Sequence, residues 1–115
     1  MTSVVLSAIN KQICSEFAAS FSYLSMAAWC EKENFVGAAH WLRLQSQEEH
    51  GHALKLFDFV LARGGEVKLE TIEVPKAKFK SLTDVFEQAL AQEQAVSRQI
   101  DGLYELAFKE KVFAA

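Results

Sequence analysis

The sequence predicts an all-α fold, a bundle of long helices. Three segments, at about 4–31, 35–62 and 81–107, repeat apolar residues at alternating spacings of three and four positions, which is the pattern of a helix with one buried face. Polar or turn-forming stretches separate the three segments. Each apolar stripe also contains one acidic residue near its middle, and this repetition points to a polar layer inside the bundle.

Composition places the chain among soluble proteins, with a single domain at 1–115. Half of the residues are hydrophobic, including nine Phe, and the net charge is −3. The sequence has no basic block of the kind that binds nucleic acid or an anionic membrane, and no apolar run approaches the ~20 residues that span a bilayer. No Lys or Arg precedes the short apolar stretch at the N-terminus, which argues against a secretory signal. We therefore expect a cytoplasmic protein.

The two cysteines, Cys14 and Cys30, lie in the first predicted helix, about 24 Å apart at the helical rise, so they cannot form a disulfide within the chain. Their spacing is not that of a metal site either. We expect two free thiols, buried or partly buried, in a reducing compartment.

The first helix should begin after Thr2 or Ser3, either of which can cap it. Its stripe contains one charged residue, Glu16. A buried carboxylate is strongly unfavourable unless it is paired or bound to a metal ion. Glu16 therefore either lies at the helix edge and reaches water, or it binds a cation. The predicted stripe is Ile9, Ile13, Glu16, Ser20, Tyr23, Ala27 and Cys30.

The second helix follows a short turn, so it should run antiparallel to the first, and it ends at a pair of glycines. Glu49 and His52 share one face of this helix because they are three residues apart. Glu16 precedes the turn by about as many residues as Glu49 follows it, so the two carboxylates should meet at one level. The predicted stripe is Ala38, Leu42, Gln45, Glu49, His52, Leu56 and Phe59.

Residues 64–80 form a long connection that contains the only proline, Pro75. Fully extended, this connection reaches up to about 56 Å, whereas the second helix is about 42 Å long. The connection can therefore run back along the bundle, so that the second and third helices start at the same end.

The third helix should start at Ser81, with Asp84 at a position resembling that of a capping box and Phe79 placed as a hydrophobic staple. Its stripe contains one charged residue, Glu93, and no fourth long helix follows in the sequence. The predicted stripe is Leu82, Phe86, Ala89, Glu93, Val96, Ile100, Leu103 and Ala107.

Packing the three stripes together would bring Glu16, Glu49, His52 and Glu93 toward one point. Three buried carboxylates repel one another and raise one another's pKa, and a metal ion removes that repulsion. Carboxylates with one imidazole suit iron or manganese, and zinc less specifically. Glu49 is the best placed to bridge two ions, since it neighbours His52 and faces both other helices.

The chain resembles the non-haem bacterial ferritins from about Leu6 to Ala115. Several separated blocks in the same order make the match specific. These blocks are Glu16 followed by Tyr23–Cys30, the segment Phe35–Leu42, the pattern Glu48-Glu49-x-x-His52-Ala53, and Gln92-Glu93-Gln94. The resemblance implies a ferritin-like four-helix architecture with a crossover between the second and third helices.

The resemblance also implies a function. Ferritins oxidise Fe(II) with O₂ or peroxide, which is a ferroxidase reaction, and they store the Fe(III) mineral inside a hollow homo-oligomeric shell of 24 subunits. By resemblance, Glu16, Glu49 and His52 would bind the first iron, Glu49 would bridge to the second iron, and Glu93 would bind the second iron.

Four neighbouring residues complete the comparison. Glu48 resembles an accessory iron ligand. Tyr23 resembles the tyrosine beside the diiron centre, although a core tyrosine with a satisfied hydroxyl would show the same pattern. His50 stands where haem-binding bacterioferritins carry Met, so we expect no haem, and its position beside the stripe predicts an exposed side chain. His40 should lie at the surface or at a subunit contact.

The chain departs from the family pattern at its C-terminal end, where a full fourth helix and a short fifth helix would follow. By resemblance, the fourth helix supplies a Glu and a further polar ligand to the second iron, so that position is incomplete here. A bundle of three helices would also expose the apolar sides of its first and third helices.

Three interpretations remain open at this stage. The sequence is a truncated ferritin subunit, or it is a short ferritin-like chain that another chain completes and that binds iron or assists assembly without ferroxidase turnover. The third interpretation is a rubrerythrin-type peroxidase, which is less favoured because the sequence has no Cys-x-x-Cys motif of the rubredoxin module.

Overall fold

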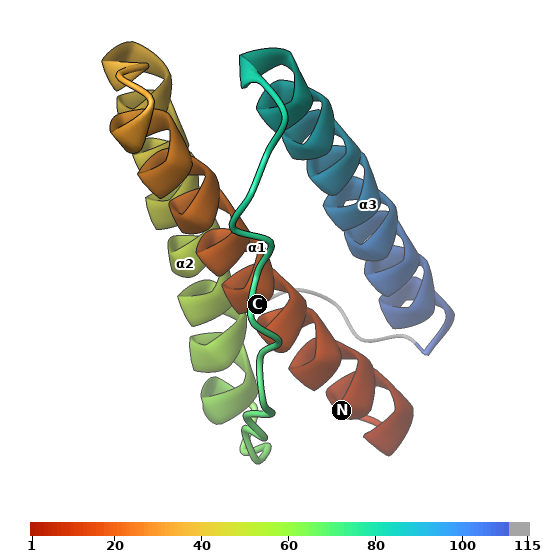
Figure 1. Cartoon of the computed structure of the whole chain (residues 1–115). Helices are drawn as coiled ribbons and strands as arrows, with labels where there is room; N and C mark the ends of the chain where they lie inside the picture. The colour runs from red at the N-terminus through yellow and green to blue at the C-terminus, as the bar shows by residue number, and fades with distance from the viewer. Residues whose placement is uncertain (111–115) are drawn as a thin grey trace.

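A computed structural model describes residues 1–110 of the chain, which form three helices: α1 (Ser3–Lys32), α2 (Val36–Ala62) and α3 (Leu82–Lys109). Figure 1 shows α1 and α2 side by side as a hairpin, with α3 inclined away from α2. The predicted all-α bundle of three long helices is confirmed, and the described part of the chain contains neither a strand nor a fourth helix. Residues 111–115, which follow the predicted third helix, lie outside the described residues.

The helix ends follow from local hydrogen bonding. The side chain of Thr2 accepts a hydrogen bond from the backbone N–H of Val5, and Ser81 accepts one from Asp84, so both predicted N-caps are confirmed. Asp84 in turn accepts a hydrogen bond from the backbone N–H of Lys80. The two bonds together fix the start of α3 and resemble a capping box, with the difference that Asp84 bonds the N–H of the residue before Ser81.

The C-terminal ends of α1 and α2 share one turn geometry. Asn34 and Gly64 have φ angles of 67° and 72°, in the left-handed region. The next residue in each case donates its backbone N–H to the carbonyl five positions earlier, from Phe35 to Cys30 and from Gly65 to Val60. These are the bonds of a Schellman motif, which satisfies the last carbonyls of each helix.

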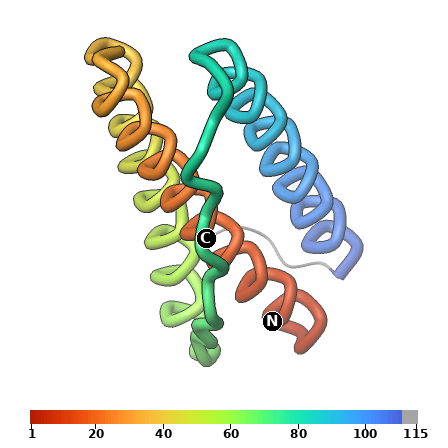
Figure 2. Tube along the Cα trace, viewed as in Figure 1, coloured from red at the N-terminus to blue at the C-terminus, as the bar shows by residue number. Residues whose placement is uncertain are grey.

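The connection between α2 and α3 runs back along the bundle over α1, as Figure 2 shows. The buried side chain of Asn10 on α1 holds it at one point: the amide donates to the carbonyl of Glu66 and accepts from the N–H of Lys68. Ser25 holds it at another, by donating to the carbonyl of Lys76. The predicted crossover is therefore confirmed, and α3 starts at the end where α2 starts.

Two apolar clusters fill the interior. The cluster near the α1–α2 turn consists of Tyr23, Met26, Ala27, Cys30, Ala39, Leu42, Val85 and Ala89. The cluster near the other end consists of Val5, Ile9, Ile13 and Val60. Buried polar side chains of α1 and α2 lie between the two clusters, so the predicted polar layer is present.

The predicted stripes meet different outcomes. Every member of the α1 stripe is buried, as predicted. The α2 stripe is wrong in part, since α2 packs on α1 through an adjacent set of residues: Ala39, Leu42, Ser46, Glu49, Ala53 and Val60. The other predicted members are only half-buried, and His52 is exposed. Of the α3 stripe only Ala89 is fully buried.

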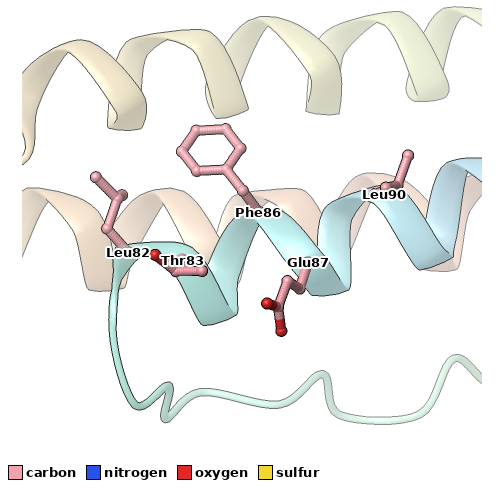
Figure 3. A pocket seen from close by; sticks show the side chains of 5 residues that line it. All are labelled: Leu82, Thr83, Phe86, Glu87 and Leu90. Carbon is pink, nitrogen blue, oxygen red and sulfur yellow. The ribbon is translucent and has the colours of Figure 1, made fainter.

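The poor burial of α3 has a direct geometric cause. Among the described residues, no Cα atom of α2 lies within 8 Å of a Cα atom of α3. One aromatic contact bridges the two helices, between Trp41 and Phe86, whose ring centroids are 5.7 Å apart. Figure 3 shows Leu82, Phe86 and Leu90 projecting from one side of α3, where they line an open pocket of about 410 Å³. The expected exposure of apolar side chains is present on α3, at Phe86 and Leu90, and on α1, at Phe21 and Leu24.

Two further predictions concern single features. Both cysteines are free, with Cys30 buried and Cys14 half-buried, as predicted. Phe79, the residue predicted as a hydrophobic staple, packs against the apolar cluster that contains Val85 and on Trp29 of α1, with the two ring centroids 5.9 Å apart. None of the helices within residues 1–110 has a stretch long and apolar enough to cross a membrane.

Two glycine substitutions should change stability in opposite directions. Gly64→Ala should lower the free energy of unfolding by about 1 kcal/mol, because the left-handed conformation is unfavourable for a residue with a Cβ atom. Gly102→Ala should raise it by about 1 kcal/mol, because Gly102 lies inside α3 with open space around it. Urea denaturation of both variants checks this, and changes of the same sign would contradict the described backbone.

Candidate metal centre

The candidate metal centre lies between the two apolar clusters, on the α1–α2 hairpin. Glu16 comes from α1, and Glu49 and His52 come from successive turns of α2. One side-chain ligand atom from each of the three lies within 4.8 Å of the other two. The Nδ1 atom of His52 is 3.9 Å from Glu16 Oε2 and 3.8 Å from Glu49 Oε2. The predicted meeting of Glu16 and Glu49 at one level is therefore observed.

Hydrogen bonds between Ser20 and Ser46 set this register. Each serine hydroxyl donates to the backbone carbonyl of the other residue at 2.8 Å, and the two Oγ atoms are 2.9 Å apart. Both side chains are buried. Ser20 lies four residues from Glu16, and Ser46 lies three residues from Glu49, so the contact fixes the two helices about one turn from the carboxylates.

The two carboxylates are buried with part of their hydrogen-bonding capacity unused. Glu16 is 1% exposed and Glu49 is 4% exposed. Within the described residues, Glu16 Oε2 and Glu49 Oε2 have no hydrogen-bond partner. Such groups are rare in folded proteins because desolvating a carboxylate oxygen without compensation is strongly unfavourable.

The electrostatics of the pair are equally unfavourable without a cation. The pKa of Glu49 is raised, first by burial, then by the adjacent Glu16 carboxyl and by the charges of Glu93 and Glu48. Without a metal ion, Glu49 therefore keeps its proton at a pH where an exposed glutamate would be ionised. A divalent cation can replace that proton, and it would neutralise both carboxylates.

The geometry fits one metal ion bound by these three residues. Ligand atoms at about 2.1 Å from a shared ion lie about 3–4 Å from one another, and His52 Nδ1 is already at that separation from one oxygen of Glu16 and one oxygen of Glu49. Two carboxylates and one imidazole form a ligand set that suits iron or manganese, and zinc less specifically. The unpartnered oxygens point to the same conclusion as the distances.

Glu93 reaches the same region from α3. Its side chain is half-buried, and its Oε1 atom accepts a hydrogen bond from the hydroxyl of Tyr23. Tyr23 is fully buried, and burial followed by the neighbouring Glu93 raises the pKa of its hydroxyl. Glu93, the fourth predicted ligand, lines the same cleft as the other three. It is not one of the three residues whose ligand atoms lie within 4.8 Å of one another.

A cleft of about 470 Å³ opens beside the centre. Glu16, Glu49, His52 and Glu93 all line it, together with residues of α2 and α3. The side chain of His52 is 53% exposed at this cleft. The metal centre is therefore accessible from the side on which α2 and α3 diverge. The other lining residues are Lys55, Leu56, Val96, Ser97, Ile100, Asp101 and Tyr104.

The remaining predicted residues lie outside this group. Glu48 is exposed and lies outside the close group of ligand atoms. His50 is exposed, as predicted, and its ring packs edge-on against Phe17, with centroids 5.2 Å apart. His40 is also exposed.

The sequence prediction did not include Gln12. Its side-chain amide donates a hydrogen bond of 3.1 Å to Glu16 Oε1, and it is 5% exposed. The signal was available, because residues four apart on a helix are neighbours. An amide near a carboxylate is common on helix surfaces, so the spacing alone could not distinguish this contact from a solvated pair.

Comparison with protein families identifies the fold. The family model of the ferritin-like domain matches residues 6–115 of the sequence. The bacterial non-heme ferritin of Bacteroides fragilis strain 638R is 42% identical over 104 residues, which are 90% of this chain and 65% of that protein. The bacterial non-heme ferritin of Staphylococcus epidermidis strain ATCC 35984 is 38% identical over 110 residues, which are 96% of this chain and 66% of that protein. The chain thus spans just under two thirds of the length of these relatives.

Solved structures agree with this assignment. An open pore ferritin from the hyperthermophilic archaeon Archaeoglobus fulgidus has a TM-score of 0.94 at 39% identity, covering 96% of this chain and 68% of that one. A humanized archaeal ferritin has a TM-score of 0.95 at 37% identity, covering 98% of this chain and 68% of that one. Family model, curated relatives and fold all coincide with the resemblance inferred from the motifs, and the chain belongs to the ferritin-like domain family.

Proposed function

We propose that this chain is the iron-binding part of an iron storage protein, in which Fe(II) is the substrate that the carboxylate–histidine centre binds. The observation that carries the proposal is the pair of buried, unpartnered oxygens of Glu16 and Glu49 beside His52. Membership of the ferritin-like family and the similarity to bacterial non-heme ferritins support iron as the metal.

The geometry supports a division of roles. Glu16, Glu49 and His52 would hold the first Fe(II) ion, since their ligand atoms lie within 4.8 Å of one another. Glu49 would bridge to a second ion, which Glu93 would bind from α3 across the cleft. Tyr23 would orient Glu93 through their hydrogen bond, and Glu48 would serve as an accessory ligand at the surface.

The proposed reaction is oxidation of Fe(II) to Fe(III), in which O₂ or peroxide accepts the electrons. The proposed site of that reaction is the diiron position between the hairpin and α3. By similarity to ferritins, we propose that the subunit assembles into a homo-oligomeric shell, in the cytoplasm, that stores the Fe(III) mineral.

We also propose a second candidate function, because α3, which carries Glu93, has few buried residues. Within the described residues, Glu93 is the one predicted ligand that α3 contributes to the second ion. Only Val85 and Ala89 of the described part of α3 are buried. On this alternative, the chain binds iron at the first position or assists assembly with another chain, without ferroxidase turnover.

Glu49→Ala should abolish tight binding of Fe(II), because it removes a ligand that both ions share. We expect the affinity to fall by more than about 100-fold in anaerobic titration calorimetry. Glu87→Ala, which removes an exposed carboxylate of α3, is the matched control and should titrate like the unsubstituted chain. Undiminished binding by Glu49→Ala would rule out the assigned centre.

The metal-free chain should lose stability as the pH rises. The pKa of Glu49 is raised above its ordinary value of 4.5, so above pH 4.5 the folded chain binds more protons than the unfolded chain. The free energy of unfolding should therefore fall from about pH 5 upward. Glu49→Gln cannot ionise, and at pH 8 it should be more stable than the unsubstituted chain by about 1–3 kcal/mol.

Urea denaturation in the presence of a chelator, at pH 5 and pH 8, checks this expectation. The difference between the two proteins should be small at pH 5 and larger at pH 8. Equal pH dependence of the two proteins would mean that Glu49 is not held with a raised pKa.

An O₂ pulse after anaerobic loading separates the two proposed functions. A chain with both positions in use should bind two Fe(II) ions per subunit and oxidise them, and light scattering should show a shell-sized particle. A small species that binds one ion per chain and does not accelerate oxidation above the rate in buffer would favour the alternative function.

A further inference from the structure

The side chain of Gln12 lies on α1 one turn before Glu16 and is almost completely buried, at 5% exposed. It lines a groove between α1 and α3, of about 380 Å³, to which Leu103 and Leu106 also contribute. The cleft beside the metal centre does not include Gln12. Gln12 therefore contacts Glu16 without lining the cleft through which the centre is accessible.

The chemistry of the contact allows only one orientation. A carboxylate accepts hydrogen bonds, so the amide must present its NH₂ group to Glu16 Oε1, as it does at 3.1 Å. The other oxygen, Oε2, is the one without a partner, and it lies 3.9 Å from His52 Nδ1. The two oxygens of Glu16 are thus distinguished: one is bound by the protein, and one is directed to the centre.

Without this contact, Glu16 could rotate about its side-chain bonds and present either oxygen or both oxygens to an ion. Chelation by both oxygens would require Oε1 to turn from the Gln12 amide toward the ion, which would strain the hydrogen bond of a buried amide and is unfavourable. A fixed outer contact of this kind orients a metal ligand and tunes its affinity.

We infer that Gln12 is a positioning residue of the first iron position, which holds Glu16 so that it binds Fe(II) through Oε2 alone. Gln12 can have this role only if Glu16 binds Fe(II), as proposed above. The contact adds a residue to the site that does not itself touch the ion. The Gln12 side chain thus contacts Glu16 and also lines the groove between α1 and α3.

The test uses the full 115-residue chain and the substitution Gln12→Met, which preserves the length of the side chain and removes the donor. Anaerobic Fe(II) titration should show a 10- to 100-fold loss of affinity at the first position. Co(II) serves as a spectroscopic probe: its visible absorption bands depend on ligand geometry and should shift if Glu16 changes from one bound oxygen to two.

Gln99→Met is the matched control. Gln99 lines the same groove from α3 and is exposed, so the same substitution there should leave the Fe(II) affinity and the Co(II) bands unchanged. If circular dichroism shows that Gln12→Met does not fold, Gln12→Asn replaces it, because the shorter amide cannot reach Glu16 Oε1 and the same loss is expected.

A double-mutant cycle separates positioning from a general structural effect. In a Glu16→Gln background, Gln12→Met should cause no further loss of affinity, because Gln12 acts through the Glu16 carboxylate. Additive losses, or Co(II) bands equal to those of the unsubstituted chain, would overturn the positioning role. Failure of the unsubstituted chain to bind Fe(II), or undiminished binding by Glu49→Ala, would instead overturn the proposed function.

Discussion

The structure depends on the burial of two carboxyl groups at the contact between two helices. Glu16 and Glu49 face each other where a helical bundle would ordinarily place apolar side chains, and each retains an oxygen without a partner. Apolar clusters above and below this layer supply the stability that the layer itself lacks. Ser20 and Ser46 lie at this contact as buried polar residues, and their hydrogen bonds fix how α1 and α2 align.

Much of the fold follows from local sequence patterns. The caps at Thr2 and Ser81 and the glycine pair after α2 define helix ends through hydrogen bonds between near neighbours, which a sequence displays directly. The crossover was predictable for a different reason, since the fully extended connection reaches farther than the length of the helix that it must pass. The hydrogen bonds that hold it, from Asn10 and Ser25, join residues more than fifty positions apart, and no local pattern reveals them.

The centre was predictable to a similar degree. The spacing of Glu49 and His52, with the level of Glu16, located the group of three ligands, because helix geometry fixes both relations. The face of α2 was predicted less well: a stripe read at average spacing could not show that Ala39, Ser46 and Ala53 lie against α1 while His52 lies at the cleft. That choice depends on where α3 packs, which is a tertiary property.

The arrangement of α3 has a consequence for the energetics of the chain. Its two fully buried residues, Val85 and Ala89, both lie in its first turns, whereas Glu93 and the residues that line the cleft come later along the helix. The later part of α3 therefore has less packing free energy opposing local separation from α1 than the hairpin has. A ligand bound by both Glu93 and the hairpin would hold that part of α3 against α1. Binding in the cleft and packing of α3 would then be thermodynamically linked, and each would favour the other by the same free energy.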